Sequence, residues 1–142
     1  MRYIFIILAI FFLSFFSPDN VKAELKIYMS PVPRDRKGNW ILFVYDNPDD
    51  FPTRPEKALV KRILPLHTPQ PVRISLPPGE YAVALFLDEN GNGKIDRNFL
   101  GIPTEPYALS GHPRFHFGPP RFEECKINVQ APETVLRLRI AD

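Results

Sequence analysis

The chain is poor in the residues that build covalent and catalytic centres. Cys125 is its only cysteine, so no disulfide can form within the chain, and we expect this side chain to be a small buried apolar group. The three histidines, His67, His112 and His116, do not have the spacing of a zinc site. No nucleophile elbow is present to support serine catalysis. The formal net charge is only +2, so we expect no nucleic-acid partner.

Long apolar runs are also scarce, because only residues 4–16 form one. Arg2 precedes this run, residues 17–20 break it, and Val21 and Ala23 stand three positions and one position before a predicted cleavage site. The run is shorter than the roughly 20 residues that a membrane-spanning helix needs. The pattern therefore predicts a signal peptide at residues 1–23 that is cleaved after Ala23.

Cleavage would leave one domain at residues 24–142, with a net charge of +1 and no membrane span. A bacterial lipoprotein is not expected, because no cysteine lies near the cleavage site. We expect a periplasmic or secreted protein. The sequence does not specify its oligomeric state.

Proline is abundant, with 17 residues, and it leaves little room for long helices. Short runs with period-two alternation, or with apolar residues on both faces, occur between the prolines and predict strands. These runs lie at residues 25–29, 40–45, 72–76, 81–87, 127–129 and 136–140. Residues 56–63 are compatible with a helix or a strand. The pattern favours an all-β sandwich formed by a single domain.

An acidic and amide-rich loop at residues 88–96 is the strongest chemical signal. Asp88, Asn90, Asn92, Lys94 and Asp96 occupy positions 1, 3, 5, 7 and 9 of a calcium-loop pattern, with a glycine at position 6. Lys94 would contribute its backbone carbonyl. The sequence thus predicts a weak calcium site, with the side chain at position 8 directed toward the core.

The pattern departs from a helix–loop–helix calcium site at position 12, where Phe99 replaces the bidentate glutamate. Glu105, Asn98 or water would have to complete the coordination. The alternative is a tight turn without metal, because two Asn-Gly pairs are also a strong turn signal and aspartates cap turns.

The long segment that follows holds two further groups of candidate residues. Tyr107, Phe115, Phe117 and Phe122 could line a glycan- or peptide-binding groove together with His112 and His116, or they could fold over one end of the sandwich. A hydrolase would instead use His112, His116, Asp96 or Glu105, with no pairing evident in the sequence.

Segments 76–84 (LPPGEYAVA), 88–96 (DENGNGKID), 98–105 (NFLGIPTE) and 118–124 (GPPRFEE) resemble the bacterial secreted family named domain of unknown function 2141. The resemblance implies an immunoglobulin- or transthyretin-like antiparallel β-sandwich of about seven strands in the bacterial envelope. It implies no activity. Leu87, segment 106–112 and Cys125 depart from the family pattern.

We therefore expect a non-enzymatic binding or envelope-structural module with a calcium-ordered loop. A glycan- or peptide-binding module and a hydrolase are the alternatives.

Overall fold

The computed structural model describes residues 21–114 and 118–141. Residues 1–20 of the predicted signal peptide lie outside the described part. The first strand, β1 (Ala23–Met29), begins at the last residue of that predicted peptide. Among the described residues, no helix is long and apolar enough to cross a membrane.

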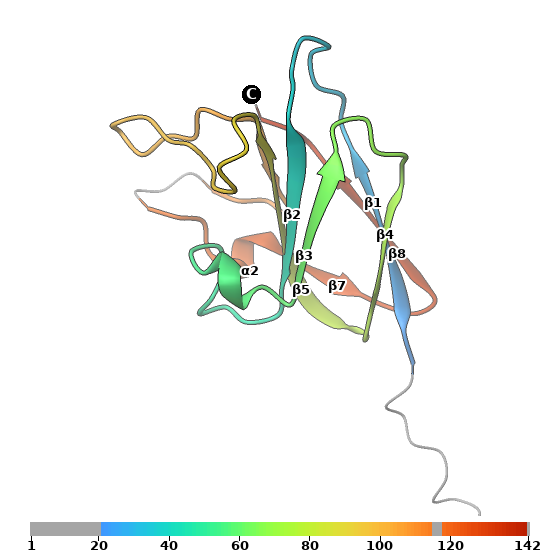
Figure 1. Ribbon diagram of the computed structural model, residues 1–142. Coiled ribbons are helices and arrows are strands. Elements are labelled where there is room, and N and C mark those ends of the chain that lie inside the picture. The colour runs from blue at the N-terminus through green and yellow to red at the C-terminus, as the bar shows by residue number, and fades with distance from the viewer. Residues whose placement is uncertain (1–20, 115–117, 142) are drawn as a thin grey trace, which may run out of the picture.

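The fold is a sandwich of two sheets, which confirms the predicted all-β class (Figure 1). The smaller sheet has the order β4–β1–β8 and contains β4 (Val72–Leu76) and β8 (Glu133–Leu138) around β1. The larger sheet has the order β3–β2–β5–β6. Its strands are β3 (Val60–Pro65), β2 (Asn39–Tyr45), β5 (Gly79–Asp88) and β6 (Tyr107–Leu109). Strand β7 (Lys126–Val129) extends this sheet by pairing with the first half of β5.

One pairing departs from the predicted antiparallel pattern. Strands β1 and β8 run parallel, with Ile27 opposite Leu136, whereas the other strand pairs are antiparallel. The segment that the sequence left open between helix and strand contains a short 3-10 turn, η3 (Pro55–Lys57), followed by β3.

The main core lies between the two sheets. Alternate residues of β1 and β4 point into it, and Leu25, Ile27 and Ile74 are almost completely buried. From the larger sheet, Trp40 and Leu85 meet them. Alternation therefore buries one face of the smaller sheet and leaves the other face in solvent, as period-two patterning predicts.

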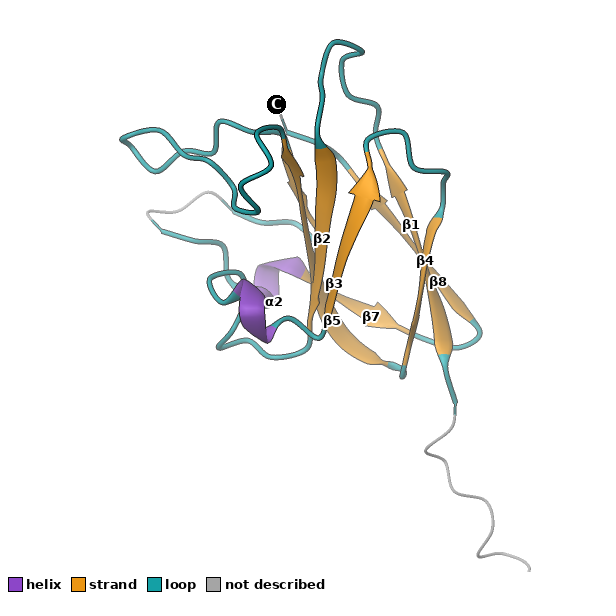
Figure 2. Cartoon of the chain, in the orientation of Figure 1, coloured by secondary structure: helices purple, strands orange, loops and turns teal. Residues whose placement is uncertain are grey.

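Strands β2 and β5 are buried on both faces, because loops cover the outer face of the larger sheet (Figure 2). A second apolar cluster fills this layer. It contains Ile41, Phe43, Tyr45, Phe51, Ala82, Phe86, Phe122 and Cys125. Phe51 comes from the loop after β2, and Phe122 and Cys125 come from the short helix α2 (Phe122–Cys125). The long connections thus form a third layer. The loop after β5 packs against this layer through Ile95.

Candidate functional site

The candidate site lies at the end of the sandwich where β5 stops and β2 begins. Asn39 pairs with Asp88, so the first residue of one strand lies beside the last residue of the other. Gly38 adopts a φ of +108°, and a Cβ at this position would lie 2.1 Å from the carbonyl oxygen of Asp88. A glycine is therefore required where the β1–β2 loop presses against the base of the site.

Asp88 is the anchor of the loop. Its side chain is buried at the end of β5, with 7% exposure. Its Oδ1 accepts the backbone N–H groups of Gly91 and Asn92 at 2.8 and 3.1 Å, and its Oδ2 accepts that of Gly93 at 2.8 Å. The loop therefore wraps around one carboxylate, and Gly91 and Gly93 provide the positive φ angles that this path requires.

Three side chains at alternate positions converge beside this anchor. The side-chain amides of Asn90 and Asn92 donate to the Asp96 carboxylate at 2.5 and 2.9 Å. The amide oxygens accept the backbone N–H groups two residues further on, those of Asn92 and Lys94. The predicted site residues Asp88, Asn90, Asn92 and Asp96 thus belong to one connected polar cluster.

Glu105 braces the two ends of the loop. It is 6% exposed, and its two carboxylate oxygens accept the backbone N–H groups of Glu89 and Asp96, both at 2.9 Å. Glu89 also forms an ion pair with Arg36 of the β1–β2 loop at 2.9 Å. Ile95 is partly buried against the second apolar cluster, as the sequence predicted. The loop is consequently held at several points along its length.

The donor set can be compared with the needs of a hard cation. Calcium takes six to eight oxygen ligands. Positions 88, 90, 92 and 96 carry carboxylate and amide oxygens, and Lys94 carries a backbone carbonyl. The side-chain oxygens at positions 88, 90 and 92 already accept backbone N–H groups. No group of three or more His, Cys, Asp or Glu side chains suited to a metal is found in the described residues, so the loop lacks the donors of a tight carboxylate cage.

The segment that contains the hydrolase candidate His112 also holds a buried serine and a buried cysteine. Ser110 is 1% exposed, and its hydroxyl accepts the N–H of Val83 at 2.8 Å while it donates to the carbonyl of Cys125. His112 has an exposed side chain, and its backbone N–H donates to the carbonyl of Glu124. The Cys125 thiol is buried, and burial raises its pKa to about 11. The thiol is therefore neutral at physiological pH, as expected for an unreactive cysteine.

The aromatic candidates divide between the interior and the surface. Phe122 is 5% exposed and packs edge-on against Phe51, with ring centroids 6.1 Å apart. Tyr107 is half-buried at the start of β6. Phe115, His116 and Phe117 lie outside the described residues. The Phe122 ring thus contributes to the outer apolar cluster.

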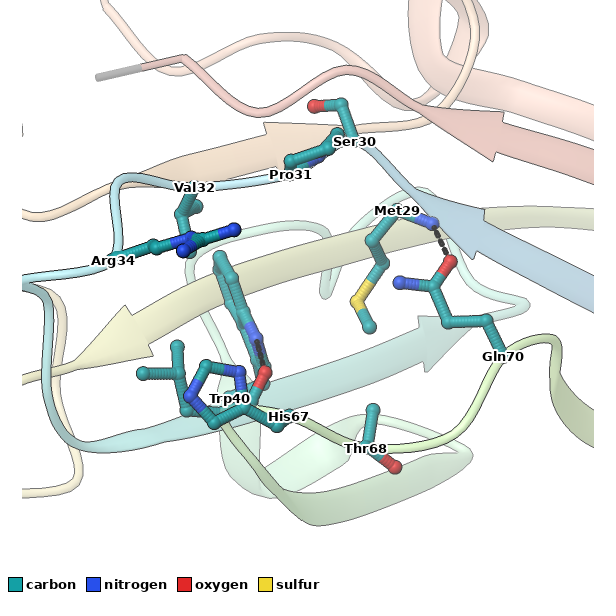
Figure 3. Close-up of a pocket in the computed structure, with 10 residues that line it drawn as sticks. Met29, Ser30, Pro31, Val32, Arg34, Trp40, His67, Thr68 and Gln70 are labelled. Carbon is teal, nitrogen blue, oxygen red and sulfur yellow. Dashed lines mark hydrogen bonds between the residues drawn. The ribbon is translucent and has the colours of Figure 1, made fainter.

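A pocket of about 420 Å³ opens near the same end of the sandwich (Figure 3). Its lining comes from the end of β1, the β1–β2 loop, β2 and the β3–β4 loop. The lining residues are Met29, Ser30, Pro31, Val32, Arg34, Trp40, Leu66, His67, Thr68 and Gln70. The indole N–H of Trp40 donates to Leu66 O at 3.2 Å, and Gln70 accepts the N–H of Met29 at 2.7 Å. The sequence did not predict this pocket. The β1–β2 loop and the β3–β4 loop line it together only because β1 and β3 belong to different sheets that pack against each other.

The two packed sheets form a β-sandwich domain. The acidic and amide-rich loop lies at one end of it. The sequence profile described as "Uncharacterized protein conserved in bacteria (DUF2141)" matches residues 32–137, and the chain belongs to this family. The matched region contains the whole candidate loop and its Glu105 brace. Comparison with curated proteins found no match, and comparison with solved structures found none either.

Proposed function

We propose that the chain is an exported β-sandwich module of the bacterial envelope, with a binding or structural role, whose loop at residues 88–96 is ordered by calcium. The pattern of residues 1–23 supports export. The family is bacterial and uncharacterised, and it assigns no activity.

The convergence of Asn90 and Asn92 on Asp96, beside the buried Asp88 carboxylate, is the observation that carries the calcium proposal. These side chains already point toward one place, so little ordering is needed before a cation binds. A half-turn of each amide would present its oxygen in place of its N–H, and the bond that this oxygen now accepts from a backbone N–H would be exchanged for one to the cation. A bound cation would also offset the negative charges that the loop brings together.

The expected affinity is low. Asp88 and Asp96 are the only carboxylates among the five predicted ligands, and Asp88 already accepts three backbone N–H groups. A carboxylate has about four lone-pair sites, so roughly one remains for a cation. Such a site belongs in the range of extracellular modules, about 10⁻⁴–10⁻³ M.

Thermal unfolding in a calcium titration tests the proposal. With a dissociation constant of about 0.5 mM, 10 mM calcium adds about 2 kcal/mol of stability, or roughly 8 °C for a domain of this size. Asp96→Asn should lose most of this rise, because it removes a ligand charge while keeping the side-chain size. Asp49→Asn, at an exposed turn far from the loop, is the matched control and should keep it. No rise for the unsubstituted chain at 10 mM calcium would refute the calcium site.

The alternatives receive less support from the geometry. For a hydrolase, the hydroxyl of Ser110 and both oxygens of Glu105 already bond to backbone groups. For glycan or peptide binding, Tyr107 and His112 remain the accessible candidates among the described residues. A screen with glycan and peptide libraries tests the second alternative, since binding that is lost in Tyr107→Ala would favour it over the structural role.

A further inference from the structure

Three large apolar side chains are exposed within four residues of the segment that follows the candidate loop. Phe99 is 96% exposed, Leu100 67% and Ile102 54%. We call residues 97–103 the apex. In Figure 1 the gold segment after β5, which includes the apex, projects away from both sheets. Contiguous exposed apolar groups of this kind mark sites of interaction with a protein or a membrane.

The apex has a defined backbone. Asn98 N–H donates to Ile102 O, and Gly101 N–H donates to Asn98 O, both at 2.9 Å. The Asn98 side-chain oxygen accepts the N–H groups of Leu100 and Ile102 at 2.9 and 3.1 Å. The Arg97 guanidinium donates to Gly101 O at 2.9 Å, and Arg97 pairs with Pro103 at the base. These bonds engage four N–H groups and three C=O groups of the apex backbone, so the turn is fixed while its apolar side chains stay exposed.

Exposed positive charges flank the apex. Lys94 and Arg97 are exposed, whereas Asp96 is half-buried and bonded to the two asparagine amides. At the same end of the sandwich the β1–β2 loop exposes Arg34 and Lys37. Together the two loops expose four cations and one anion, Asp35. Arg36 and Glu89 are not counted, because they form an ion pair with each other. The charges that face solvent in these loops are therefore mostly positive, while the carboxylates of Asp88, Asp96 and Glu105 lie buried or half-buried beneath them.

We propose that the apex docks on the surface of an anionic phospholipid bilayer, where Phe99, Leu100 and Ile102 enter the boundary between headgroups and acyl chains. The hydrogen bonds within the apex lower the cost of moving its backbone toward the acyl chains. A projecting apolar tip suits a deformable lipid surface, and the surrounding cations meet the lipid phosphates. A protein partner would have to offer a matching apolar cleft with an acidic rim.

This inference rests on the proposed location in the envelope and does not require calcium. The two proposals are separable, because calcium is tested by unfolding of the free protein and the apex by its contact with lipid. Vesicle measurements in millimolar calcium and in a chelator show whether the ion contributes.

A tryptophan placed at the tip reports insertion directly. The protein is expressed from the complete sequence, and mass spectrometry verifies that all variants share one N-terminus. Phe99→Trp is mixed with vesicles of phosphatidylglycerol and phosphatidylethanolamine, with and without brominated acyl chains. The natural Trp40 is 2% exposed, so the unsubstituted chain provides the background emission. We expect a blue shift and quenching by the brominated lipid for the tip tryptophan alone.

Vesicle flotation tests the energetic role of the tip. The double variant Phe99→Ser/Leu100→Ser should lower the partition coefficient at least about tenfold, since each side chain loses apolar contact with lipid. Ile63→Ser is the matched control, because Ile63 is 64% exposed on the edge strand β3, and it should bind as the unsubstituted chain does. Thermal unfolding verifies that the variants remain folded.

Several results would overturn the inference. One is the absence of binding to anionic vesicles at low salt. Another is binding that the double variant retains in full with no quenching of the tip tryptophan, which would indicate adsorption by charge alone. A third is an apex-dependent dimer in analytical ultracentrifugation without vesicle binding, which would make a second copy of the chain the partner.

Discussion

Replacement of Ser110 by alanine tests the internal bonding of the outer layer. The serine hydroxyl links the central strand β5 to the end of α2 by accepting the N–H of Val83 and donating to the carbonyl of Cys125. Ser110 is 1% exposed, and Val83 and Cys125 are completely buried. Alanine keeps the backbone bond between Ser110 N–H and Val83 O but leaves one donor and one acceptor without a partner.

The expected cost follows from those two groups. A buried polar group that loses its partner costs about 1–3 kcal/mol, and the cavity left by one hydroxyl is too small to hold a water that bonds to both. Ser110→Ala should therefore lower the free energy of unfolding by about 3 kcal/mol. For a domain of this size, that corresponds to a decrease of roughly 12 °C in Tm.

Urea unfolding followed by circular dichroism measures this change. Ser75→Ala, at an exposed position of β4, is the matched control and should change stability by less than about 0.5 kcal/mol. If Ser110→Ala is as stable as the control, the bridge between β5 and α2 does not contribute as argued.

Three further predictions concern the same region. Gly111 has a φ of +69°, and a Cβ there would lie 2.4 Å from Glu124 O, so Gly111→Ala should lose roughly 2–4 kcal/mol in urea unfolding; an unchanged midpoint would contradict this close approach. Burial raises the pKa of Cys125 to about 11, so iodoacetamide at pH 8 should modify the thiol only after denaturant is added, and rapid labelling of the folded protein would contradict its burial. Because burial raises the pKa of the folded thiol above the 9.0 of an exposed cysteine, this group's contribution to stability is present below pH 9 and is lost as pH rises toward 11. Cys125→Ala should accordingly show a shallower decrease in Tm over that range.

The period-two pattern predicted most of the strands of the sandwich. A strand with one buried and one solvated face alternates apolar and polar residues, and this alternation is visible in the sequence. Strand β6 was not predicted, since three residues are too few to establish a period. Strand β3 was ambiguous because its residues are mostly exposed and it lies at a sheet edge. The parallel pairing of β1 with β8 could not be predicted, because a strand shows the same alternation of apolar and polar residues whether its neighbour is parallel or antiparallel.

The candidate loop was located by the spacing of its oxygen-bearing residues, and the structure brings four of these side chains together. The role of Glu105 as a brace depends on backbone N–H groups at positions 89 and 96, which no side-chain pattern encodes. Phe99 entered the sequence analysis only as the residue that breaks a calcium-loop pattern. Its full exposure depends on the hydrogen bonds of the apex, which become visible only in three dimensions.

The parallel pairing of β1 with β8 determines when the smaller sheet can form during synthesis of the chain. Lys26 of β1 meets Glu133 of β8 across a sequence separation of 107 residues. In a chain synthesised from its N-terminus, β1 is made long before β8, so the smaller sheet cannot close until β8 has emerged. Contacts of such separation slow folding, because a large loop must be closed before they form. The topology therefore leaves the smaller sheet open until β8 is present, whatever else has already folded.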